Sequence, residues 1–248
     1  MTKSAIQRTI QAAVALCFVG SAAVVHADSL PFVPTFTIGT VTLTNDAVVA
    51  NPDGSFTVSG EQQGGSFNGG AVWDMTWNLT LNQDPSVSGT LTLTNLTNTV
   101  RNFAVTFGLP VSPAFSPSVH GGSISATLTD AGGAVGAQLA PTTNPAIYRG
   151  TIDGTTVMSL FGASLSCNSG SLGCFTSLTD QDGLPGPTLP GGAVNSSIGM
   201  LLNFSLTPGD KVEFATNFQV EPVPLPAAAP LLLFGFGAFA AARRRRRV

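Results

Sequence analysis

The sequence predicts an all-β domain, an antiparallel β-sandwich of jelly-roll-like type, between an N-terminal signal peptide and a C-terminal transmembrane helix. Three observations indicate this fold. Apolar and polar residues alternate through segments that recur about every ten residues. Clusters of Gly, Pro, Asn and Asp separate these segments, and no amphipathic helix pattern lies between them. The chain therefore divides into residues 1–27, 28–221 and 222–248.

The first segment, Met1–Ala27, has the features of a secretory signal peptide. Lys3 and Arg8 give it a positive start, and the apolar run Ile10–Val25 follows. Small side chains next to the end of this run predict cleavage after Ala27. The alternative is an N-terminal membrane anchor, for which the apolar run is short.

Five segments of the middle region alternate regularly enough to be predicted as strands with one buried face. The predicted buried faces consist of Trp73, Met75, Trp77, Leu79 and Leu81; Leu91 and Leu93; Phe103, Val105, Phe107 and Leu109; Ile198, Met200, Leu202, Phe204 and Leu206; and Val212, Phe214, Thr216, Phe218 and Val220.

Turn residues predict which strands are neighbours. The segment Asn51–Gly54 and the dipeptide Asp153-Gly154 each predict a hairpin between the strands on either side. Thr207–Asp210 has similar turn chemistry and lies between the alternating segments 198–206 and 212–220. A third antiparallel hairpin is therefore predicted there.

The stretch Ser164–Gly192 is irregular and rich in Gly and Pro, which predicts an exposed loop. It contains Cys167 and Cys174, the two cysteines that remain once the signal peptide is removed. In an oxidising compartment these two residues are predicted to form a disulfide, and the alternative is two buried thiols. The chain has no Cys/His quartet of the kind that holds structural zinc.

The middle region is strongly acidic. It contains three basic residues, Arg101, Arg149 and Lys211, against thirteen Asp and Glu, which gives a net charge of −10. Phosphate binding requires Lys and Arg, so this charge argues against a nucleic-acid partner. It suits a protein that stays soluble outside the cell.

The C-terminal segment places a short Pro-containing motif before an apolar run and a basic end. The motif is Val223, Pro224, Leu225, Pro226 and Ala227, and the basic end is Arg243, Arg244, Arg245, Arg246 and Arg247. A helix over 227–242 would be about 24 Å long, and snorkelling arginine side chains make up the difference to a hydrocarbon core of about 30 Å. The arginines predict that this end stays in the cytoplasm, with the middle region outside.

This order of motif, apolar span and arginine cluster resembles the PEP-CTERM sorting signals of Gram-negative bacteria, in the variant called VPLPA-CTERM. The resemblance covers residues 223–248 and implies that an exosortase, a membrane-embedded cysteine protease-transpeptidase, removes the tail. The new C-terminus would then pass to another carrier. Pro-Glu-Pro itself is absent from the chain, which leaves the exosortase subtype open. The alternative is a single-span anchor that is never cut.

Candidate residues for chemistry are few. His120 stands beside two glycines and is predicted to be an exposed loop residue rather than a base or a ligand. Asp180 and Asp182 resemble part of a calcium loop, but the distal Glu is missing and turn chemistry explains them equally well. Trp73 and Trp77 could form a platform for sugar rings, although their alternation favours the core.

The expected function is that of an exported, exosortase-processed cell-surface or extracellular matrix protein without catalytic activity or cofactor. It would be held in the inner membrane before processing, and its expected partners are signal peptidase, the secretion machinery and the exosortase. The resemblance also implies an association with exopolysaccharide. The middle region resembles secreted PEP-CTERM-type proteins too, but less closely than the tail does. The chain lacks G-x-S-x-G, P-loop and H-E-x-x-H motifs. Two alternatives are a carbohydrate-binding module, which would use a sheet face or residues 164–192, and a secreted hydrolase.

Overall fold

The computed structural model of the chain describes Phe32 and residues 34–66, 69–131, 136–142, 146–167 and 174–223. Within this part of the chain, all regular secondary structure is β-strand and all strand pairs are antiparallel. The predicted all-β, antiparallel architecture is therefore confirmed. The predicted signal peptide, 1–27, and the predicted membrane helix, 227–242, lie outside the described residues.

One of the two sheets, called sheet A below, has the strand order β11-β10-β15-β7-β1-β2; in addition, β9 pairs with β15, and β12 pairs with β9. Its strands are β1 (Thr35–Ile38), β2 (Val41–Thr42), β7 (Arg101–Pro110), β9 (Ala137–Pro141), β10 (Tyr148–Ile152), β11 (Thr155–Leu160), β12 (Leu165–Cys167) and β15 (Ser197–Leu206).

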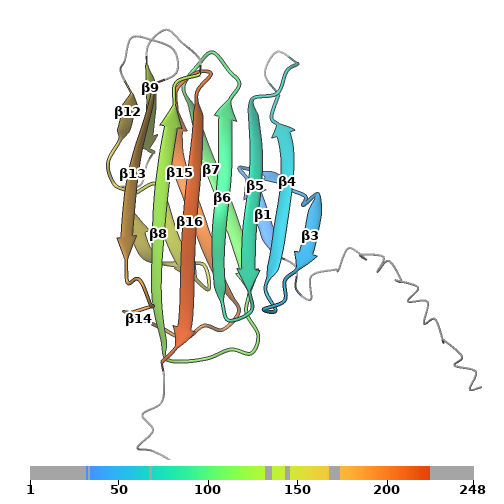
Figure 1. Cartoon of the computed structure of the whole chain (residues 1–248), viewed down its shortest axis with the longest axis vertical. Coiled ribbons are helices and arrows are strands. Elements are labelled where there is room, and N and C mark those ends of the chain that lie inside the picture. Colours follow the sequence, from blue (N-terminus) through green and yellow to red (C-terminus); the bar gives the residue numbers. More distant parts are fainter. Residues whose placement is uncertain are drawn as a thin grey trace, which may run out of the picture.

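The second sheet, sheet B, has the strand order β13-β8-β16-β6-β5-β4-β3, with β14 paired to β8. Its strands are β3 (Ala47–Ala50), β4 (Phe56–Gly64), β5 (Trp73–Asn82), β6 (Ser86–Asn95), β8 (Ser118–Thr129), β13 (Phe175–Asp182), β14 (Leu189–Gly191) and β16 (Lys211–Pro222). In Figure 1 the strands of sheet B lie in front and those of sheet A lie behind them.

Two of the three predicted hairpins are present. β3 pairs with β4 across the turn that contains Gly54, and β10 pairs with β11 across Asp153-Gly154. Asp153 and Gly154 have φ angles of 48° and 78°. Both central residues of a type I′ turn need positive φ, which Asp tolerates and Gly adopts freely.

The third predicted hairpin, between 198–206 and 212–220, is wrong. β15 pairs with β7, β9 and β10 in sheet A, whereas β16 pairs with β6 and β8 in sheet B. The segment between them crosses from one sheet to the other. A tight turn leads equally well into a hairpin or into a sheet crossing, because its local chemistry does not choose the partner strand.

The expectation of one exposed loop over 164–192 is also wrong for most of its described residues. This stretch contributes β12, β13 and β14, and all eight residues of β13 pair with β8. β13 is an edge strand with a burial pattern that does not alternate, so its sequence lacks the period-2 signal. Cys167 and Cys174 are joined in a disulfide with Cα atoms 6.1 Å apart, in agreement with the predicted pairing.

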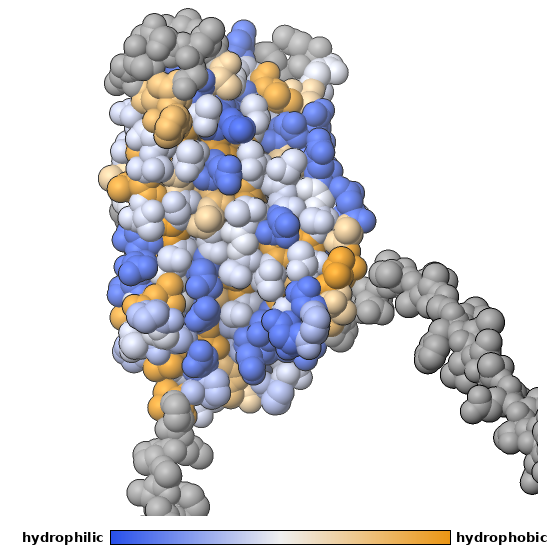
Figure 2. Space-filling model, viewed as in Figure 1, coloured by the Kyte–Doolittle hydropathy of each residue, from blue (hydrophilic) through white to orange (hydrophobic). Residues whose placement is uncertain are grey.

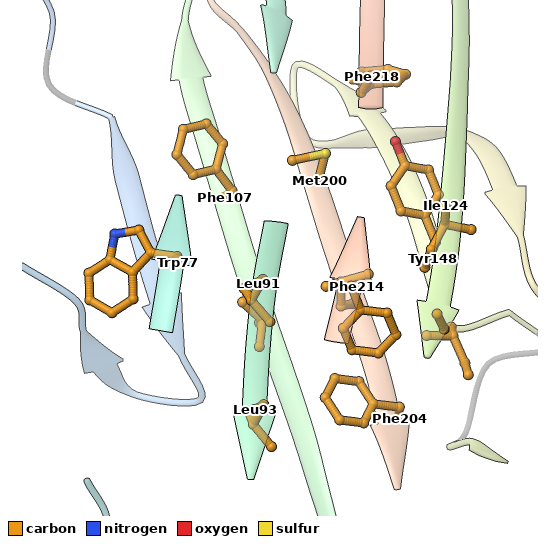
Figure 3. Packing of buried hydrophobic residues seen from close by; sticks show 14 of the residues in the cluster. Trp77, Leu91, Leu93, Phe107, Ile124, Tyr148, Met200, Phe204, Phe214 and Phe218 are labelled. Carbon is orange, nitrogen blue, oxygen red and sulfur yellow. The ribbon is translucent and has the colours of Figure 1, made fainter. Parts of the chain in front are cut away.

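The hydrophobic core fills the space between the two sheets, and the predicted buried faces supply most of it. Figure 3 shows side chains from both sheets meeting there, among them Phe107, Met200 and Phe204 from sheet A and Leu91 and Phe214 from sheet B. The ring centroids of Phe204 and Phe214 are 5.0 Å apart in an edge-on arrangement. Such aromatic contacts add to the area burial that holds the sheets together.

Candidate functional site

The last described strand, β16, ends at Pro222, at one end of the sandwich (Figure 1). Glu221 pairs with Val119, and Pro222 pairs with Ser118 at the start of β8. The backbone N–H of Val223 then donates a hydrogen bond of 3.0 Å to the carbonyl oxygen of Pro117. The folded body therefore holds the chain as far as the first residue of the predicted sorting motif.

The other predicted residues of the two processing signals fall in segments that the structure does not describe. They are Ala27 at the predicted signal cleavage site, Pro224, Leu225, Pro226 and Ala227 of the motif, and the cluster Arg243–Arg247. In the described part of the chain no helix is long and apolar enough to cross a membrane.

A groove of about 480 Å³ lies beside the end of β16. The turn between β5 and β6 and the last residues of β16 line it, and its charged side chains are the carboxylates of Asp84 and Glu221. The backbone N–H of Val220 donates to Pro85 O at 2.9 Å and joins the two sides. The lining is Asn82, Asp84, Pro85, Ser86, Gln219, Val220, Glu221 and Pro222.

His120 is not an exposed loop residue, and that prediction is wrong. It lies in β8, is only 3% exposed and points into the sandwich. Its Nε2 lies 3.2 Å from the carbonyl oxygen of Val157. A carbonyl can only accept, so Nε2 carries the hydrogen and Nδ1, which is buried without a hydrogen-bond partner, is unprotonated.

The surroundings of His120 favour the neutral form of its ring. Burial lowers the pKa of the imidazole, and this effect outweighs the hydrogen bond to Val157 and the nearby charge of Asp182, which both act to raise it.

The glycine after His120 is explained by close packing rather than by a turn. A Cβ at Gly121 would lie 2.3 Å from the carbonyl oxygen of Gly183.

Trp73 and Trp77 belong to the core, as their alternation predicts. They are 5% and 3% exposed, so their ring faces cannot serve as a sugar-stacking platform. Trp77 donates from Nε1 to Asn45 Oδ1 at 2.9 Å, which satisfies its one polar group. Its ring lies under Gly60, where a Cβ would come within 2.4 Å of it.

The two calcium candidates, Asp180 and Asp182, have separate surroundings. Asp180 Oδ2 accepts a hydrogen bond of 2.7 Å from the backbone N–H of Phe161, which follows β11 of the opposite sheet. Asp182 acts electrostatically on His120. Among the described residues no three His, Cys, Asp or Glu side chains gather closely enough to hold a metal ion.

Sequence reasoning missed Asp153 as an organising carboxylate. Its two oxygens accept five hydrogen bonds of 2.8–3.0 Å from backbone and side-chain donors of Asn195, Ser196 and Ser197. Desolvation raises the pKa of this carboxyl, but the hydrogen bonds from Asn195, Ser197 and Ser196 together outweigh it and hold the pKa well below its usual range. The Asp-Gly turn was visible in the sequence, whereas its distant donors were not.

The outer face of sheet B contains a shallow hollow of about 430 Å³ over β4, β5 and β6. Figure 2 shows this face, on which hydrophilic and intermediate residues predominate and hydrophobic ones are scattered. Two cross-strand rows form much of the hollow: Ser59, Asn78 and Thr90, and Glu61, Thr76 and Thr92. These side chains offer hydroxyl, amide and carboxylate groups to a ligand in solution.

Comparison of the chain with protein-family profiles and with curated protein sequences finds no match.

Proposed function

We propose that this protein is an exported, non-catalytic component of the cell surface or extracellular matrix, released from a membrane anchor by an exosortase. In this proposal a jelly-roll-like sandwich is the displayed body. The inner membrane holds it through 227–242 until the tail is cut, after which it belongs to the cell surface or an exopolysaccharide-rich matrix.

The observation that carries the proposal is the order of features at the C-terminal end. The last strand leaves the sandwich at Pro222, the motif Val223–Ala227 follows without a linker, and the apolar span and Arg243–Arg247 come after it. A membrane-embedded enzyme requires a recognition sequence next to a membrane span, and this arrangement supplies one at the edge of a folded domain.

A non-catalytic role agrees with the state of the side chains most suited to catalysis. His120 is buried with its Nε2 committed to Val157, and the carboxylates of Asp153 and Asp180 accept hydrogen bonds from backbone N–H groups. A hydrolase would need several such groups free in one pocket. The groove beside the end of β16 brings together two carboxylates, Asp84 and Glu221, but no histidine is among its lining residues.

Intact mass spectrometry of protein recovered from the native cell surface tests the proposal. We expect a mass that lacks residues 1–27 and the arginine tail. A variant in which Pro224 and Pro226 are replaced by Ala should stay in the membrane with its tail. The control is Pro187→Ala, a matched change within the body, which should lose its tail as the unmodified chain does. Surface protein that retains Arg243–Arg247 would contradict exosortase processing.

The hollow on sheet B favours a second candidate function, the binding of polysaccharide by hydrogen bonds rather than by ring stacking. Replacing both Thr76 and Asn78 by Ala should weaken binding of exopolysaccharide from the native cells by about five- to tenfold, the effect of losing one or two net hydrogen bonds. Thr106→Ala, on the outer face of sheet A, is the control. Equal affinity of both variants in affinity electrophoresis would rule out this face.

A further inference from the structure

We propose that the folded body restrains its own processing, because it holds the first residue of the sorting motif until the end of β16 opens. This inference rests on the proposed function and adds to it a control step at the same site. The structural basis is the contact between Val223 and Pro117 and the position of β16 in sheet B.

The restraint begins with the hydrogen bond from the N–H of Val223 to Pro117 O, at 3.0 Å. It continues inward, because Pro222 and Glu221 are in register with Ser118 and Val119 of β8. The other side of β16 is held as well, by pairing with β6 and by the bond from Val220 to Pro85 O. The chain can therefore leave the sheet only by fraying from Val223 inward.

The distance to the membrane is short. From Val223 to Ala227, the first residue of the apolar span, there are four peptide units, which reach at most about 14 Å when fully extended. An enzyme embedded in the membrane must therefore work between the bilayer and the end of the sandwich. It must also take up the motif as an extended chain whose backbone groups are free to bind it.

The contact of Val223 with Pro117 and the need for a free, extended motif conflict as long as the end of β16 stays paired. The N–H group of Val223 cannot pair with an enzyme while it donates to Pro117, and the motif has no spare residues on its body side. Opening of the last contact resolves the conflict. End fraying of this kind costs little compared with global unfolding, so the contact slows processing without blocking it.

An insertion tests this restraint in the full-length chain in native cells. Four residues, Gly-Ser-Gly-Ser, are placed between Pro222 and Val223. The contact with Pro117 uses only the backbone, so the first inserted residue replaces Val223 as donor and the sandwich keeps its last bond. The motif moves outward by up to about 14 Å. The control places the same four residues after Gly186, which has open space around it.

Pulse-chase labelling measures how fast the tail is lost from each chain. We expect the insertion before Val223 to speed processing by about two- to tenfold, the range by which one net hydrogen bond shifts an equilibrium. The control should match the unmodified chain. Equal melting temperatures of the two processed proteins establish that both insertions leave the fold intact.

If the chain with the insertion before Val223 loses its tail at an unchanged or slower rate, the proposed restraint is wrong, while exosortase processing itself is not affected. Loss of processing in both insertion chains, with the unmodified chain still cut, would also overturn it. A tail that persists on the unmodified chain would instead overturn the proposed function, and this inference with it.

Discussion

The side-chain amide of Asn95 donates a hydrogen bond of 3.0 Å to the carbonyl oxygen of Leu206, 111 residues further along the chain. Asn95 ends β6 in sheet B, and Leu206 ends β15 in sheet A. The same side chain also bonds to the carbonyls of Thr99 and Thr207 and accepts from Thr97. One fully buried residue thus ties together two connections that cross between the sheets.

Replacement of Asn95 by Ala should therefore destabilise the protein strongly. The change leaves several buried carbonyl and N–H groups without partners, at about 1–3 kcal/mol for each group that water cannot reach. We expect a loss of about 3 kcal/mol in the unfolding free energy, measured by urea denaturation. Asn98→Ala, an exposed change in the same connection, is the control, and equal losses in both variants would refute the role of Asn95.

His120 should make stability depend on pH in a defined direction. Burial lowers the pKa of His120 in the folded protein, so the unfolded chain binds a proton more readily. The contribution of neutral His120 to the unfolding free energy is fully present above about pH 6.5, the pKa of histidine in the unfolded chain. It is lost as the pH falls from there toward the lower pKa of His120 in the folded protein. The unfolding free energy should decrease between pH 7.5 and 5.5, with a slope of at most about 1.4 kcal/mol per pH unit.

His120→Gln provides the control for this pH effect. Carboxyl groups with ordinary pKa values stay ionised over most of that range, so the variant should be nearly insensitive to pH whatever its absolute stability. An equally steep decrease in the variant would assign the effect to other groups.

Asp153 should stabilise, through its charge, the end of the sandwich at which β16 ends. Asp153→Asn removes an acceptor oxygen from a carboxylate that receives five hydrogen bonds, and we expect a loss of about 1 kcal/mol, reduced by solvent screening. The pKa of Asp153 is lowered, so this stability is present above the unfolded pKa of about 3.9 and is lost as pH falls below it. Asp84→Asn, an exposed change, should have little effect, and thermal melts at pH 7 and pH 3 compare the two variants.

Gly60 should tolerate no side chain. A Cβ at this position would lie 2.4 Å from Cζ2 of Trp77, which is packed between the sheets and cannot move freely. Gly60→Ala should cost about 1–3 kcal/mol and shift the tryptophan emission spectrum. Gly186→Ala meets open space and should leave both the melting temperature and the emission unchanged. Unchanged stability together with an unshifted spectrum in Gly60→Ala would contradict this prediction.

The sequence predicts strands better than it predicts their partners. Alternation identified the buried faces of β5, β7, β15 and β16 because each has one face on the core. The partner of β15 could not be predicted in this way. The turn after Leu206 is compatible with a hairpin, and only packing of the whole core places β15 and β16 in different sheets.

The errors at the candidate site have similar causes. The two glycines after His120 are typical of a loop, yet in the structure they allow Gly183 and Met158 to approach β8 closely. The local spacing of Asp180 and Asp182 resembles a calcium loop, whereas the hydrogen-bond donor to Asp180, Phe161, belongs to a distant segment. The sequence pattern of a segment predicts the backbone conformation of that segment. Contacts with distant segments leave no signal in it.

The last strand in the sequence occupies an interior position in sheet B, between β6 and β8. Under the proposed export, a chain that emerges from the export channel N-terminus first would have two open strand edges and an uncovered core until β16 has crossed. In that proposal, folding would be completed only after the whole body, including β16, has been translocated. Truncation before Lys211 should consequently yield a protein that aggregates or is degraded, rather than a shorter sandwich.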